Sequence, residues 1–168
     1  LPPAPVQLPG PPVAAARAEM AWLNGDLEQI MCEARFVLEL AQSYDDPWLQ
    51  GEFAFWKWRA GGAIETHRKI AAPYELLMSG DWRAAAEAWR QIGFPYEEAM
   101  ALADGDESAQ RAALEIFEGL GAGPAAERLR QTLRAHYQSC LWRRANGRPA
   151  LSCQRRVSHA HTLKKRRR

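Results

Sequence analysis

Cysteine is scarce in this chain, acidic residues stop at Glu127, and no long apolar run occurs. The three cysteines are too few and too scattered for the disulfide framework of a small secreted domain. No run approaches the roughly 20 apolar residues needed to cross a bilayer. The first residues, LPPAPVQLPGPP, lack both the basic and the apolar region of a signal peptide. We therefore expect a cytoplasmic setting, with Cys32 as a small buried side chain inside a helix.

The formal charge of +2 hides a division of charge along the chain. Residues 1–128 hold 10 basic and 20 acidic residues, a net charge of −10. Residues 129–168 hold 12 basic residues and no acidic one, a net charge of +12. This asymmetry predicts an acidic folded body joined to a basic tail. The absence of an initiator Met indicates a piece of a longer chain.

Residues 78–135 have the pattern of short amphipathic helices separated by glycine, proline and aspartate. Apolar residues recur one helical turn apart over 81–93 and again over 108–120, which gives each helix one apolar face. Small and bulky residues alternate on these faces, so neighbouring helices can approach closely. The faces are predicted to consist of Trp82, Ala85, Ala86, Trp89 and Ile92 in the first helix and Ala109, Ala112, Ala113, Ile116, Phe117 and Leu120 in the second.

Upstream, the same spacing predicts further helices, over 13–24, 27–43, 48–60 and 73–78. The segment 63–71 is short and carries the lone His67, expected to be solvated. The helix over 48–60 is apolar nearly all round and rich in aromatic residues. It is either the central helix of a bundle or the wall of a ligand pocket, and helix-spaced aromatic residues favour the central helix.

A Gly-Asp pair occurs three times, at Gly25-Asp26, Gly80-Asp81 and Gly105-Asp106, each time between two predicted helices. Glycine suits the end of one helix and aspartate caps the start of the next. Such spacing is typical of helix–turn–helix units that bury their faces by stacking. We predict an all-α, tetratricopeptide-like array of antiparallel helix pairs over 13–135. A proline-rich linker remnant (1–12) precedes it, and a basic disordered tail (136–168) follows.

Residues 80–135 also resemble a known family on the strength of two stretches, GDWRAAAEAWRQIGFPYEEAMALADGDE and ALEIFEGLGAGPAAERLRQTLRA. They are similar to the tetratricopeptide-like region before the helix-turn-helix of large LuxR-type bacterial transcriptional regulators. Those regulators also carry a P-loop ATPase domain. The chain departs from them after Arg134, where no Leu-Thr-x-Arg-Glu signature follows, and it contains no GxxxxGK[ST] motif. The resemblance therefore implies neither ATP binding nor sequence-specific DNA reading by this chain.

Catalytic and metal sites find little support in the sequence. The carboxylates of Glu97, Glu98, Asp104, Asp106 and Glu107 cluster at predicted helix starts, where they favour the positive end of the helix dipole. No Ser, His and Asp set suggests a catalytic triad. A zinc site made of Cys140, Cys153, His159 and His161 is disfavoured, because its cysteines are not closely paired. We expect no enzyme activity, no metal and no cofactor.

Two functions remain open. The first is a protein-interaction and signal-coupling fragment of a LuxR-type regulator, whose partner is another protein or other domains of its parent. The second is a small nucleic-acid-binding protein that acts weakly and without sequence preference through its tail. Its phosphate contacts would be Arg143, Arg144, Arg155, Arg156, Lys164, Lys165, Arg166, Arg167 and Arg168. The mixture of residues in the tail is also what a GC-rich gene yields in a shifted reading frame, a hypothesis that the genomic DNA would test.

Overall fold

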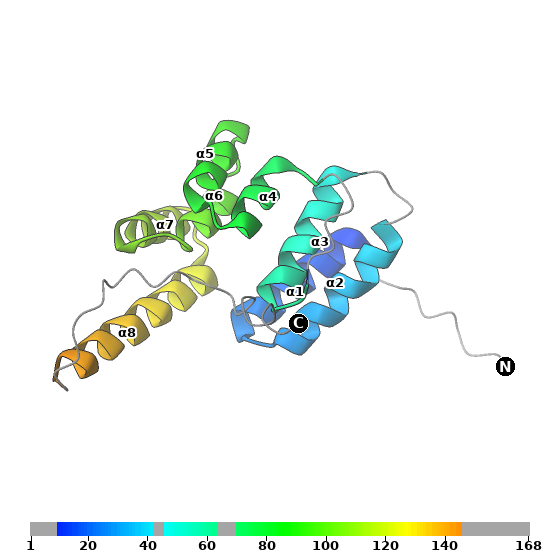
Figure 1. Cartoon of the computed structure of the whole chain (residues 1–168). Coiled ribbons are helices and arrows are strands. Elements are labelled where there is room, and N and C mark those ends of the chain that lie inside the picture. The colour runs from blue at the N-terminus through cyan, green and yellow to red at the C-terminus, as the bar shows by residue number, and fades with distance from the viewer. Residues whose placement is uncertain (1–9, 42–45, 64–69, 146–168) are drawn as a thin grey trace, which may run out of the picture. The chain divides into compact units, whose positions relative to one another are not determined.

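The computed structural model describes residues 10–41, 46–63 and 70–145, and over these residues the chain is all-helical with no strand (Figure 1). The prediction of an all-α fold is confirmed. The chain forms two compact units, Leu1–Met78 and Ser79–Arg168. The span 13–135, predicted as one repeat domain, is therefore divided between them.

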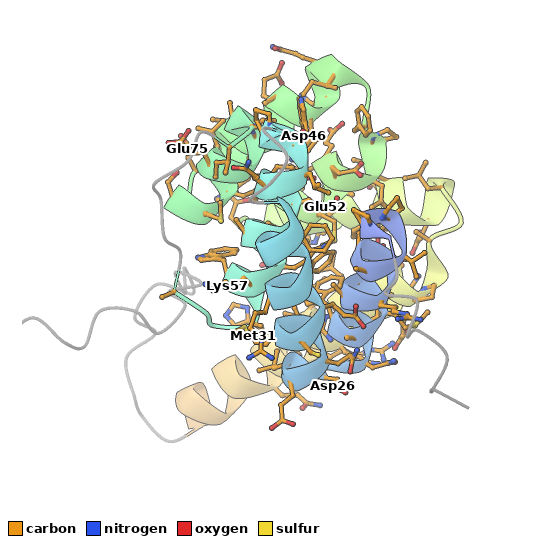
Figure 2. The ribbon with its side chains drawn as sticks, turned by 90° about the vertical axis from the view of Figure 1, so that its right-hand side faces the viewer. Asp26, Met31, Asp46, Glu52, Lys57 and Glu75 are labelled. Atoms are coloured by element: carbon orange, nitrogen blue, oxygen red, sulfur yellow. The ribbon has the colours of Figure 1, made fainter. Side chains whose placement is uncertain are left out.

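The first unit contains α1 (Pro11–Asn24), α2 (Leu27–Ala41), α3 (Pro47–Arg59) and most of α4 (Ala72–Ser79). The first three helices pack against one another in all pairs. Asp46 caps α3 by accepting hydrogen bonds from the amides of Trp48 (2.9 Å) and Leu49 (3.3 Å). Figure 2 shows Asp26, before α2, and Asp46, before α3, at opposite ends of the unit, so these two helices run antiparallel.

Helix α3 supplies the aromatic core of the first unit. Phe53, Phe55 and Trp56 are buried, and the guanidinium of Arg59 lies 4.9 to 5.7 Å from the ring centroids of Phe55, Trp58 and Trp22. Since Trp22 belongs to α1, these stacked groups join the two helices. Three aromatic side chains of this segment thus belong to a packed core, and its place as the central helix of a bundle stays a prediction.

The second unit contains α5 (Trp82–Ile92), α6 (Pro95–Leu102), α7 (Glu107–Gly119) and α8 (Gly123–Ala145). Each helix packs against the next one along the chain. More than half of the buried apolar residues of these helices are alanines, two in each helix: Ala85 and Ala86, Ala99 and Ala101, Ala109 and Ala113, and Ala125 and Ala126. The structure shows four helices packed in series. The predicted tetratricopeptide-like arrangement stays a prediction.

The aspartates of all three Gly-Asp pairs cap helices as predicted, and two of the three glycines adopt the predicted conformation. Each aspartate accepts a hydrogen bond from the amide three residues later, at 3.0 to 3.1 Å. Gly25 and Gly80 adopt the left-handed conformation, with φ of 76° and 90°. Gly105 serves a different need, because a Cβ there would lie 2.7 Å from the Cβ of Ala109. Close approach of the chain, rather than a positive φ, requires this third glycine.

Several expectations differ from the structure. The last helix, expected to end near residue 135, continues to Ala145, so the predicted start of the tail is wrong. Cys32 is exposed rather than buried. Ile92 and Leu120, assigned to buried faces, are exposed because each lies at or beyond the last turn of its helix. His67 and most of segment 63–71 lie outside the described residues.

Gly51 provides a test of the packing of the first unit. A Cβ at this position in α3 would lie 2.5 Å from Cδ2 and 3.1 Å from Cγ of Tyr74. We expect Gly51→Ala to lower the free energy of unfolding of this unit by about 1–3 kcal/mol, because the Tyr74 ring must move. Urea denaturation followed by tryptophan fluorescence measures the change.

The matched control is Gly119→Ala in α7, where an added Cβ meets no atom within 4 Å. There the substitution is expected to be neutral, or stabilising by up to about 1 kcal/mol, because alanine is the better helix former. Equal destabilisation by both substitutions would contradict the close contact between α3 and Tyr74.

Candidate interaction surface

Helix α8 is covered on its first half by α7. Ala125, Ala126 and Leu129 are buried, and α7 packs against α8. The guanidinium of Arg130 donates to the carboxylate of Glu118 in α7, with 2.5 Å between Nη2 and Oε1. Helices α7 and α8 are thus held together by buried apolar side chains and by one ion pair.

The lengths of the two helices differ. At a rise of about 1.5 Å per residue, the 13 residues of α7 span roughly 20 Å and the 23 residues of α8 roughly 35 Å. Because the chain reverses between Gly119 and Gly123, α7 lies alongside the early residues of α8. The second half of α8 therefore extends past α7, and Figure 1 shows its orange end beyond α7.

Two side chains near and beyond the end of α7, those of Arg134 and Tyr137, are exposed. Arg134 is 68% exposed in its side chain, and its Nη1 lies 3.6 Å from Oε1 of Glu127. Tyr137 is 66% exposed, whereas Leu133 is half-buried. Glu127 is the last acidic residue of the whole chain. All charged residues after it, in α8 and in the rest of the sequence, are arginine or lysine.

The predicted nucleic-acid contacts fall into two groups. The backbone of Arg143 and Arg144 belongs to α8, so they follow Tyr137 in one continuous helix. The remaining seven predicted residues lie outside the described part of the chain: Arg155, Arg156, Lys164, Lys165, Arg166, Arg167 and Arg168.

The sequence prediction missed Leu133, Arg134 and Tyr137 as surface residues. The i, i+4 spacing of Leu129, Leu133 and Tyr137 is the signal that could have identified the face.

The carboxylates at helix starts mostly serve the helices. Asp106 caps α7, and Glu97, Glu98 and Glu107 lie in first turns, as predicted. Glu98 has a second role, because its Oε1 accepts from Nε (3.0 Å) and Nη2 (2.7 Å) of Arg90 in α5. Hydrogen bonding to Glu98, then its negative charge, raises the pKa of Arg90 above its ordinary value.

Within the described ranges, no group of three or more His, Cys, Asp or Glu side chains is placed to hold a metal ion. Of the candidate zinc ligands, Cys140 lies in the backbone of α8 and the other three fall outside those ranges. None of the helices described is both long and apolar enough to span a bilayer.

No family model, curated protein or solved structure matches this chain.

The Arg90–Glu98 pair yields a prediction for the second unit. The Glu98 side chain is 10% exposed and that of Arg90 57% exposed. We expect Glu98→Gln to lower the free energy of unfolding by about 1–2 kcal/mol, because two charge-assisted hydrogen bonds are lost. Water can still reach Arg90, so the cost stays below that of a fully buried pair. Urea denaturation followed by circular dichroism tests this.

Glu87→Gln is the matched control, since Glu87 contacts the same arginine at 2.8 Å but is 52% exposed. Removal of the Glu87 charge is expected to change the free energy of unfolding by less than about 0.5 kcal/mol. The assignment of Glu98 as the structural partner fails if both substitutions cost the same.

Proposed function

We propose that this chain is a helical protein-interaction and signal-coupling module of the kind found in LuxR-type bacterial regulators, acting in the cytoplasm. The observation that carries the proposal is the serial packing of α5 to α8, which ends in a helix whose second half extends past α7. Serial helices present an extended surface to partners, because each one contacts only its neighbours. The resemblance of residues 80–135 to the repeat region of these regulators supports the same function.

Coupling would follow from how the helices touch. Helices α5 to α8 bury eight alanines between their larger side chains, and such close packing leaves little free volume. A partner that shifts one helix therefore changes the packing of the next. In the parent regulator, this change would reach whatever follows α8.

A second candidate function is favoured by one observation, the run of basic residues in the second half of α8. Arg134 is exposed there, and Arg143 and Arg144 follow in the same helix with no acidic residue after Glu127. Such a helix could bind nucleic acid through phosphates, with strong salt dependence and no sequence preference.

Photo-crosslinking distinguishes the two candidates. A photoreactive amino acid in place of the exposed Tyr137 is expected to give, in the native cells, an adduct of discrete mass that survives nuclease and is lost on protease treatment. An excess of unmodified chain should compete with it, because a specific site saturates.

The control position is Met20 in α1, which is 59% exposed and belongs to the other unit. No adduct of the same mass is expected from it. A nuclease-sensitive adduct at Tyr137 would instead support nucleic-acid binding. Complete absence of protein adducts at Tyr137, Ile92 and Leu120 would contradict the interaction module.

A further inference from the structure

One apolar stripe runs along α8 from its covered half into its uncovered half. Ala126, Leu129, Leu133 and Tyr137 follow one another at intervals of three, four and four residues, which places them on one face of the helix. Ala126 and Leu129 are buried, Leu133 is half-buried and Tyr137 is exposed. The face that α7 covers therefore continues beyond α7.

The covered half shows what kind of helix this face accepts. Helix α7 carries three glutamates and one arginine, and it buries Ala113 and Phe117. Its Glu118 pairs with Arg130 of α8 beside the apolar contact. An acidic amphipathic helix thus already packs on the first half of this basic helix.

Beyond the contact with α7, no other described helix of this unit packs on α8. Leu133 and Arg134 lie where the contact with α7 ends, and Tyr137 continues the apolar stripe past it. Arg143 and Arg144 extend the positive charge along the helix. Residues 136–145 span about 15 Å, which is enough to seat roughly three turns of a second helix.

We propose that the uncovered half of α8 docks an acidic amphipathic helix of a partner protein, which lies on the stripe as α7 does on the first half. The inference rests on the proposed function and names the chemistry of the partner. The apolar residues of the partner contact Leu133 and Tyr137, and its carboxylates pair with the arginines of α8. Charge complementarity selects an acidic helix over a neutral one.

Two other occupants fit this face less well. A second α8 from another copy of the chain would bring arginines against arginines, because α8 holds five arginines and one glutamate. Nucleic acid would satisfy the arginines but would leave the apolar stripe at Leu133 in water.

The test measures binding of a fluorescein-labelled, helix-stapled peptide to the full chain by fluorescence anisotropy. The peptide repeats the pattern of α7, with Leu and Phe on one face and flanking glutamates. We expect saturable binding that Tyr137→Ala and Arg134→Glu each weaken about fivefold or more, because each removes a central contact. A peptide with lysines in place of the glutamates should regain affinity for Arg134→Glu.

The controls use equally exposed residues elsewhere. Arg111→Glu reverses a charge on α7, at a side chain that is 71% exposed, and Met20→Ala removes an exposed apolar residue of α1. Both should keep the affinity within about twofold of the unmodified chain. All four variants change exposed side chains, so the fold is expected to persist, and circular dichroism checks it.

Three results would overturn the inference. A scrambled peptide of the same composition could bind equally well, which would mean charge attraction alone. A 20-base-pair DNA could bind more tightly than the peptide, with no effect of Tyr137→Ala, which would assign the helix to nucleic acid. The peptide could also fail to bind. If protein adducts then arise at Ile92 or Leu120 but not at Tyr137, the interaction module stands and only its docking face is wrong.

Discussion

Close contact between small side chains is the constraint on which the second unit depends. Each of its four helices buries two alanines, and such small side chains let backbones approach closely. Gly105, in the turn before α7, shows how little space is left, because a Cβ there would lie 3.0 Å from Cδ2 of Trp82 in α5. Larger residues at these positions would force the helices apart. Specific contacts such as Arg90–Glu98 add to this packing and fix how α5 meets α6.

The first unit adds aromatic rings to its buried alanines. Phe53, Phe55 and Trp56 of α3 are buried, and so are Ala14, Ala18 and Ala21 of α1. The guanidinium of Arg59 lies over the rings of Trp22 in α1 and Phe55 in α3, and these cation–π contacts connect the two helices. The second unit likewise buries two large rings, Trp89 and Phe117, beside its alanines. Both units thus fill their cores with large and small side chains together.

Local signals explain most of what the sequence could predict. Pro47, Pro95 and the three Gly-Asp pairs mark helix starts because capping and proline geometry act over a few residues. The helices themselves followed from apolar spacing. The division into two units was not predicted, since it depends on which helices meet in space.

Surface features were predicted less well, for a physical reason. The second half of α8 is polar and basic, so its helical period is weak, and the end of the helix was expected ten residues too early. Cys32 was expected to be buried because cysteine usually is, yet it lies on the exposed side of α2. The spacing of Leu129, Leu133 and Tyr137 marks the apolar face of α8 in the sequence, but that this face continues past α7 follows only from the lengths of the two helices.

Hydrogen exchange along α8 tests most directly the claim that α7 covers only the first half of this helix. Mass spectrometry of the full chain should show amides of residues 127–135 exchanging at least about tenfold more slowly than those of residues 139–145, because uncovered helix opens locally. The amides of α7 provide the internal reference for protected helix. Equal protection along α8 up to Ala145 would contradict the account, since it would mean that its second half is already covered.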